Sequence, residues 1–252
     1  MSLIDTTIHG HVHELRLARA PVNALNPELC NAITHALRDA VGNGAQGIVL
    51  AGGPKVFSAG LDVPYLLSLG TDQDSLLQAW AAFFTAARTL ASSPVPVVAA
   101  MAGHAPAGGC VLALCCDYRI MADGPFRIGL NETQVGLVAP EGIQALLARA
   151  VGAHRAERLL VAGAMPEARD ALRIGLVDEL TDLEDVATRA RVWLEELLQL
   201  PRMPMLETRR IARRAVVDCL RDDRIDLERF VTGWMDPDTQ AALRAMLARI
   251  GK

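Results

Sequence analysis

The sequence predicts an α/β fold with a helical C-terminal region, and three observations support this. Short apolar runs that suit buried strands alternate with helix-like segments up to about residue 140. Beyond that point the pattern is almost wholly helical. The length of 252 residues and a hydrophobic content of 51% suit one large domain with a sizeable core. Strands separated by helices need crossover connections, so a largely parallel sheet is expected.

The N-terminal segment is predicted to be a strand hairpin, over 3–9 and 12–18, that turns at Gly10. Three histidines alternate along it and would share one face of a regular strand, where they could bind a metal. They are His9, His11 and His13. We expect the turn at Gly10 to break this face, which favours a solvated hairpin and no metal site.

The middle of the chain is predicted to hold three buried strands and the helices between them. The strands cover 47–51, 95–101 and 118–121. The helices cover 27–41 and 74–92, and a short helix opens at Gly108. Asn26 can cap the first of these helices, and Pro27 suits its first turn.

Helices dominate the remainder of the chain. They are expected over 140–151, 154–163, 166–173, 184–200, 204–222 and 225–248, with one short strand over 175–178. No repeat or low-complexity linker separates this part from the α/β part. We therefore expect one domain, with an α/β core over 1–195 and a helical region over 196–252.

Composition excludes several classes of partner. The net charge is −4 and no long basic run occurs, so a nucleic-acid partner is not expected. The five cysteines lack C-x-x-C spacing, which favours a reducing compartment, and Cys115 and Cys116 are expected to pack as small buried side chains. The N-terminus lacks a basic segment followed by an apolar run, and no apolar stretch reaches the ~20 residues that span a bilayer. A cytoplasmic protein without a membrane partner is expected.

Two stretches are suited to presenting backbone N–H groups to a ligand oxygen. One is 57–62 and the other is 106–111, and each follows a predicted buried strand. Small residues let the backbone approach a ligand, and a helix start leaves N–H groups unpaired. A tight turn or close packing would explain either stretch alone. Together they favour an oxyanion hole, in which one donor contributes about 3 kcal/mol.

These stretches resemble motifs of the crotonase (enoyl-CoA hydratase/isomerase) superfamily. The similar segments are 20–25, 55–62 and 106–110, in matching order and spacing. Within the superfamily, the chain is most similar to the mitochondrial-type delta-3,delta-2-enoyl-CoA isomerases, through 57–62, 116–120 and 128–134. The resemblance implies a ββα spiral core over 1–195 that binds acyl-CoA. It also implies a helical trimerisation region over 196–252, in a homotrimer or a dimer of trimers.

The resemblance also implies roles for individual residues. Leu61 and Gly108 would supply the N–H groups of the oxyanion hole, and Glu132 would be the catalytic base and acid. The residues implied to line the substrate are Val22, Ala24, Ala59, Gly60, Asp62 and Asn131. No metal or separate cofactor is expected, because CoA is part of the substrate.

One position favours isomerisation over hydration. Hydratases of the superfamily use two glutamates, and the first would occupy the position of Val111, which cannot hold or deprotonate water. The resemblance thus implies an isomerase that shifts a 3-enoyl-CoA double bond to the 2-trans position, in fatty acid β-oxidation.

Two alternatives stay open. Glu141 could be a second acid, which would make the protein a hydratase or another lyase of the superfamily. The favoured interpretation of Glu141 is a favourable charge in the first turn of a helix after Pro140. The other alternative is a member that binds acyl-CoA or RNA without catalysis.

The sequence gives weaker indications of the roles of several other polar side chains. Asp62 is expected to hold its turn through hydrogen bonds to the backbone. Lys55 is a candidate for contacting the adenosine part of CoA. Four arginines on a C-terminal helix could meet CoA phosphates, although a solvated helix face is the default. They are Arg209, Arg210, Arg213 and Arg214.

Overall fold

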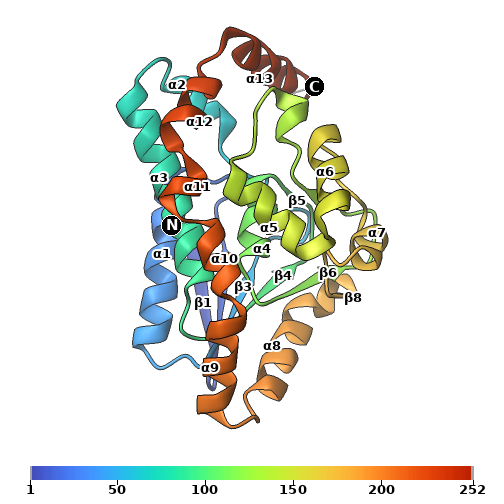
Figure 1. The fold of residues 1–252 in the computed structure, drawn as a ribbon. Coiled ribbons are helices and arrows are strands. Elements are labelled where there is room, and N and C mark those ends of the chain that lie inside the picture. Colours follow the sequence, from blue (N-terminus) through green and yellow to red (C-terminus); the bar gives the residue numbers. More distant parts are fainter. Residues whose placement is uncertain (1, 251–252) are drawn as a thin grey trace.

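The computed structural model describes residues 2–250 and has a six-stranded sheet at its centre (Figure 1). The strands, in sheet order, are β1 (Ile4–His9), β2 (Val12–Leu17), β3 (Gly47–Ala51), β4 (Val97–Met101), β6 (Tyr118–Ala122) and β8 (Glu179–Thr181). The hairpin strands β1 and β2 are antiparallel, and every other pair is parallel. The predicted α/β class and the turn at Gly10, where φ is 60°, are confirmed.

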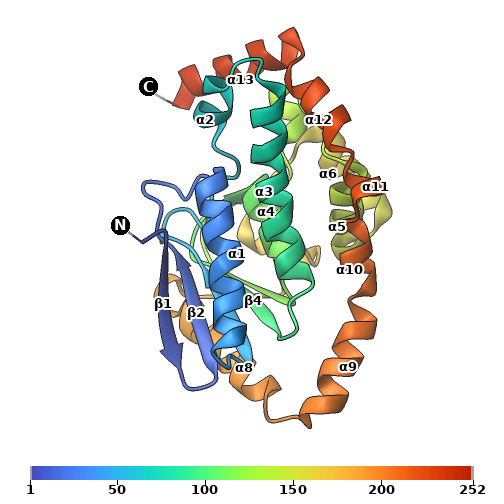
Figure 2. The ribbon, with the colours of Figure 1, turned by 90° about the vertical axis from the view of Figure 1, so that its left-hand side faces the viewer.

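The central strands are buried on both faces, and alternate residues serve two different hydrophobic clusters. Ile48 and Leu50 of β3 belong to the larger cluster, whereas Val49 belongs to the smaller one. Helix α8 (Val186–Leu197) covers the smaller cluster. The helices over the other face include α1 (Pro27–Gly42), α3 (Gln73–Ala91), α4 (Gly108–Leu114) and α5 (Glu141–Val151). Figure 2 shows α1 and α3 side by side beyond the hairpin.

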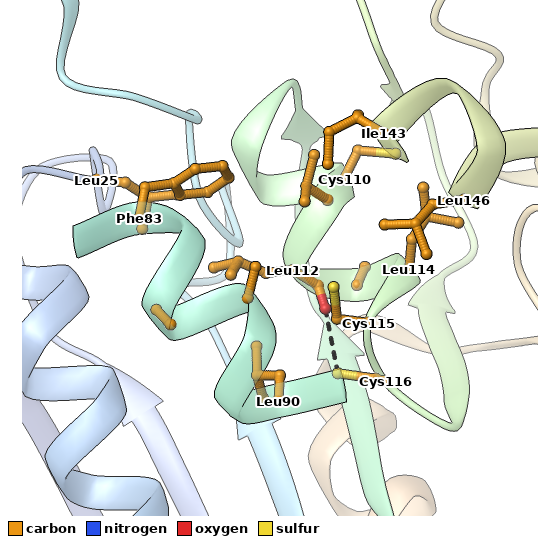
Figure 3. Close-up of a cluster of buried hydrophobic side chains, with 14 of the residues drawn as sticks. Leu25, Phe83, Leu90, Cys110, Leu112, Leu114, Cys115, Cys116, Ile143 and Leu146 are labelled. Atoms are coloured by element: carbon orange, nitrogen blue, oxygen red, sulfur yellow. Dashed lines mark hydrogen bonds between the residues drawn. The ribbon is translucent and has the colours of Figure 1, made fainter. Parts of the chain in front are cut away.

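Helix α4 is the centre of the larger cluster. Figure 3 shows it between α3, which contributes Phe83, and α5, which contributes Ile143 and Leu146. Every residue of α4 is buried. All five cysteines are buried and free, and the thiol of Cys116 donates to the carbonyl of Leu112 at 3.3 Å. The cysteines thus act as small core residues, which confirms the prediction made for Cys115 and Cys116.

Local capping explains where several helices begin. The Asn26 side chain accepts from the N–H of Leu29 at 2.9 Å, so α1 starts where the sequence predicted. The sequence did not predict the short helix α2 (Val63–Ser68), which Asp62 caps. Two further helices, α6 (Ala153–Ala162) and α7 (Ala168–Arg173), follow α5 at the positions expected.

Three elements predicted for the C-terminal part differ from those in the structure. The predicted helices 204–222 and 225–248 are five shorter ones: α9 (Arg202–Ala212), α10 (Arg214–Cys219), α11 (Asp222–Ile225), α12 (Leu227–Trp234) and α13 (Pro237–Ile250). Asp226, at φ 40°, ends α11 and caps α12. Asp236 accepts from the N–H of Asp238 just before α13. The predicted strand 175–178 is a turn, because the N–H groups of Leu176 and Val177 donate to Ala171; pairing with β6 starts at Glu179.

Two of the four C-terminal arginines hold α9 and α10 against the core. Arg209 binds both carboxylate oxygens of Asp117, at 2.7 and 2.8 Å, and the carbonyl of Ser93 at 2.7 Å. Arg213 is buried and donates to the carbonyls of Cys115 and Cys116 at 2.6 and 3.1 Å. Both the solvated face and the phosphate contact predicted for these two residues are therefore wrong. Arg210 and Arg214 are exposed.

Arg209 and its neighbour Arg210 make a matched pair for testing this attachment. Replacing Arg209 by methionine leaves the Asp117 carboxylate short of a buried partner, so we expect the free energy of unfolding to fall by about 3 kcal/mol. Arg210 pairs with Glu207 on the surface, and Arg210→Met should change stability by less than about 0.5 kcal/mol. Urea unfolding of both variants and of the wild type measures these changes in the free energy of unfolding. Equal losses would show that the Asp117 contact does not anchor α9.

Candidate active site

The chain segments that leave β3, β4 and β6 pair with one another beyond the main sheet. Val56 and His104 form a parallel bridge, in which the N–H of His104 donates to Lys55 at 3.0 Å and that of Phe57 donates to His104 at 2.8 Å. Strand β5 (Ala105–Pro106) then pairs in parallel with β7 (Ile128–Gly129). Three segments that are distant in the sequence therefore run side by side and end at one place.

Close contact between the first two segments explains their small residues. A Cβ atom at Gly109 would lie 2.5 Å from the carbonyl oxygen of Ser58, which is backbone and cannot turn away. Gly60 has a φ of 81°, and a Cβ there would lie 3.1 Å from the nitrogen of Gly108. The turns that carry Leu61 and Gly108 are thus packed directly against each other.

The backbone N–H groups of Leu61 and Gly108 have no acceptor within residues 2–250. Gly108 is the first residue of α4, where a helix leaves its N–H groups unpaired. The residue before it, Ala107, has φ 45° and ψ −117°, a conformation that disfavours a side chain. Such strain costs on the order of 1–3 kcal/mol and clusters at functional sites. Two unpaired donors therefore stand next to a strained turn, as an oxyanion hole requires.

A cavity of about 640 Å³ brings the predicted site residues together. Its walls include Val22, Ala24, Ala59, Leu61, Asp62, Gly108, Asn131 and Glu132. Gly60 is the one predicted residue outside this lining; its role is the tight turn that places Leu61. Two surface depressions, of about 1050 and 1090 Å³, are larger, but neither contains the predicted base, a predicted N–H donor or a residue predicted to line the substrate.

Glu132 begins the 3-10 helix η1 (Glu132–Val135), just after β7. Its Oε2 atom is buried and has no hydrogen-bond partner within the described residues. Burial raises the pKa of this carboxyl to about 7, and the only opposing effect is a hydrogen bond to its own backbone. The Oδ1 atom of neighbouring Asn131 is also buried without a partner in the same part of the chain. Glu132 can therefore exchange a proton near neutral pH.

The other carboxylate in the cavity lining, Asp62, is already engaged. Its Oδ1 accepts from the N–H of Tyr65 at 3.0 Å, and its Oδ2 accepts from Arg19 at 2.6 Å. These bonds confirm the prediction that Asp62 holds its turn. Val111 also lines the cavity, and its side chain cannot take or give a proton. Among the residues described, Glu132 is thus the only unpaired carboxyl group in the cavity wall.

Glu141 does not share the cavity with Glu132. It lies in the first turn of α5, its side chain is 72% exposed, and its Oε1 accepts from Arg224 at 2.7 Å. It lines the depression of about 1090 Å³ on the outer surface. The geometry therefore favours the predicted helix-start role over a second catalytic acid.

Sequence reasoning missed the aromatic end of the cavity. Trp80, Phe83 and Phe84 come from α3, and Phe230 and Trp234 come from α12. The rings of Trp80 and Phe230 meet edge to face with centroids 4.3 Å apart. Helix α13 adds Leu243, Met246 and Leu247 to the cavity lining. Helical spacing of aromatic residues on α3 and α12 was the available signal, but only the fold shows that these faces meet.

Residues 2–250 contain neither a cluster of metal ligands nor a membrane-spanning helix. No group of three or more His, Cys, Asp or Glu side chains there is arranged to hold a metal ion. No helix in the same range is both long and apolar enough to cross a bilayer. Lys55 is exposed next to the first turn, and its contact with CoA stays a prediction.

Comparisons with known proteins agree with this geometry. A family model described as enoyl-CoA hydratase/isomerase matches residues 7–225. The mitochondrial enoyl-CoA delta isomerase 1 of Mus musculus is 32% identical, over 98% of this chain and 86% of its own length. A probable enoyl-CoA hydratase of Mycobacterium avium is 34% identical over 75% of this chain and 72% of its own.

A solved structure extends the similarity to the whole fold. The human mitochondrial delta3-delta2-enoyl-CoA isomerase superposes with a TM-score of 0.92 at 30% identity, covering 99% of this chain and 98% of that one. The predicted family resemblance and the predicted fold are therefore confirmed.

The buried carboxyl group predicts a pH-dependent difference in stability. Because the pKa of Glu132 is higher in the folded state, the wild type should lose stability as pH rises from about 4.5 through about 7. Glu132→Gln has no such titration, so its free energy of unfolding should exceed that of the wild type by up to about 3 kcal/mol at about pH 8, and by little at about pH 4. Urea unfolding at both pH values measures this. A difference that does not vary with pH would contradict the burial argument.

Proposed function

Because this chain belongs to the enoyl-CoA hydratase/isomerase family, we propose that it is a delta-3,delta-2-enoyl-CoA isomerase, which converts 3-enoyl-CoA to 2-trans-enoyl-CoA. The observation that carries the proposal is Glu132, the one unpaired carboxyl that residues 2–250 place in a cavity lined also by Leu61, Gly108 and Val111. Isomerisation needs one group that takes a proton and returns it, and two donors that stabilise an enolate.

The reaction begins when the thioester oxygen accepts hydrogen bonds from the N–H groups of Leu61 and Gly108. These bonds draw charge onto the oxygen and acidify the hydrogens on the α carbon. The Glu132 carboxylate takes one α proton, and the electron pair of that C–H bond delocalises over a dienolate. The same carboxyl then delivers the proton to the γ carbon. The double bond moves to the 2 position, and the atoms of the substrate are unchanged in number.

The environment of Glu132 suits both halves of this transfer. A pKa of about 7 keeps much of the group ionised near neutral pH, yet makes it a stronger base than an ordinary glutamate. No cation pairs with the carboxylate within the described residues, so no ion pair reduces its basicity. Asp62 supports the site indirectly, because its bonds to Tyr65 and Arg19 hold the turn that follows Leu61.

The remaining parts of the proposal follow the family. Residues Val22, Ala24 and Ala59, with the turn at Gly60, would line the path of the CoA arm. Asn131 would lie beside the acyl group. Residues 196–252 would support a homotrimer or a dimer of trimers, and the reaction would feed fatty acid β-oxidation in the cytoplasm. CoA enters as part of the substrate, and the proposed chemistry uses no further cofactor.

A hydratase is the main alternative, because hydratases are also among the similar proteins. Hydration would need a second group that holds water near Glu132. The candidate for that role, Glu141, is paired with Arg224 and lies outside the cavity. Supplying 3-enoyl-CoA and 2-trans-enoyl-CoA separates the two reactions. Rapid water addition to the second substrate, without conversion of the first, would contradict the isomerase proposal.

Two glutamates of the chain make a matched test of the base. Glu132→Gln should lower kcat/KM for 3-enoyl-CoA by roughly 10²–10⁴-fold, because the amide cannot take the α proton. Glu141→Gln removes an exposed carboxylate outside the cavity and should change kcat/KM by less than about twofold. The conjugated product, followed by absorbance, gives both rates. Unchanged turnover in Glu132→Gln would exclude it as the base. If the wild type binds acyl-CoA but does not turn it over, the alternative of a non-catalytic family member is favoured.

The pH dependence of the reaction gives an independent check. The free enzyme must have Glu132 ionised, so kcat/KM should rise with pH through about 7 and then level off. A midpoint at about 4.5, the ordinary value for glutamate, would mean that the reacting carboxyl is not the buried one. Rates at saturating and limiting substrate across the pH range supply the profile.

A further inference from the structure

The aromatic end of the active-site cavity lies against a second hollow. The depression of about 1090 Å³ runs along the outside, between the loop after η1 and the helices α11 to α13. Three residues line both the cavity and this depression, which we call the outer groove. They are Leu137, Pro140 and Phe230. Residues that face both spaces separate them, so these three side chains form a partition.

The partition is held from both sides. The hydroxyl of Thr239 on α13 donates to the carbonyl of Gly136 at 2.7 Å, directly before Leu137. The side chain of Gln144 on α5 donates to the carbonyl of Ala139 at 2.8 Å, directly before Pro140. The third residue, Phe230, has its ring edge to face against that of Trp80. The partition is therefore a fixed wall.

An acyl chain that grows from the oxyanion hole would meet this wall. The aromatic and aliphatic lining around Trp80, Phe84 and Trp234 favours methylene groups, and each buried CH₂ gains about fourfold in affinity. That gain ends where the chain reaches the partition. A longer chain has to fold back or leave its last carbons in solvent, and further length adds no affinity.

We propose that Leu137, Pro140 and Phe230 set the longest acyl chain that this protein binds. The inference rests on the proposed function, since it assumes that the cavity holds an acyl-CoA. Removing part of the partition joins the cavity to the outer groove, and longer chains then pass through. These residues determine specificity and take no part in proton transfer.

Calorimetric titration with saturated acyl-CoA thioesters, from butanoyl-CoA to eicosanoyl-CoA, tests the proposal without requiring turnover. Wild-type affinity should rise with chain length and then stop rising. For Phe230→Ala and Leu137→Ala, the affinity should continue to rise beyond that length. The longest chains should bind these variants at least tenfold more tightly than they bind the wild type. Leu137 lies on a loop, so its variant serves if Phe230→Ala does not fold.

Two matched controls make the test specific to the partition. Phe84→Ala is the same truncation at a residue that lines the cavity alone, and Thr232→Ala alters the outer groove alone. Both should keep the wild-type length limit. The proposal is overturned if the partition variants keep that limit, or if Phe84→Ala extends it equally. A wild type that binds acyl-CoA with a length limit but does not isomerise 3-enoyl-CoA refutes only the proposed function. One that binds no acyl-CoA refutes both.

Discussion

The parallel pairing of the segments that leave β3, β4 and β6 is the constraint on which the rest of the site depends. The bridge between Val56 and His104, and the pairing of β5 with β7, bring three distant parts of the chain to one edge of the cavity. Each segment then ends in one functional group: the N–H of Leu61, the N–H of Gly108 or the carboxyl of Glu132. Backbone hydrogen bonds fix the relative positions of these groups, so an oxyanion hole and a base require no flexible side chain to hold them together.

The same pairing accounts for the chemistry of Glu132. Strand β7 is buried, and the Glu132 carboxyl that follows it has no ion-pair partner among the described residues; the one cation in the cavity lining, Arg19, is bound to Asp62. Burial without compensation destabilises the ionised form and raises its pKa to about 7. Part of the folding free energy is thus used to keep a stronger base at the site. This lowers the free energy of unfolding. Stabilising contacts elsewhere offset the loss: the buried helix α4, and the hydrogen bonds of Arg209 to Asp117 and of Arg213 to Cys115.

Much of this was predictable from the sequence, and the reasons are local. The buried strands, the Asn26 cap, and the turns at 57–62 and 106–111 depend on short patterns, and the structure places them as expected. The features that were missed depend on contacts between distant segments. The pairing of β5 with β7 involves two residues on each side, too few to produce a periodic pattern. The aromatic end of the cavity needs α3 and α12 to meet, and the buried roles of Arg209 and Arg213 need Asp117 from elsewhere in the chain.

In the proposed reaction, one carboxyl group carries one proton between two carbons of the same substrate. A 3-enoyl-CoA bearing deuterium on its α carbon tests this most directly, with mass spectrometry and NMR locating the label in the product. One of the two α positions keeps its label in the product. Of the deuterium that is removed, we expect part at the γ carbon of 2-trans-enoyl-CoA and the remainder lost to solvent exchange on Glu132. The Glu132→Gln protein should transfer none. Equal transfer by that variant would contradict the role of Glu132 as the base. A product heavier by one water molecule would show hydration and contradict isomerisation.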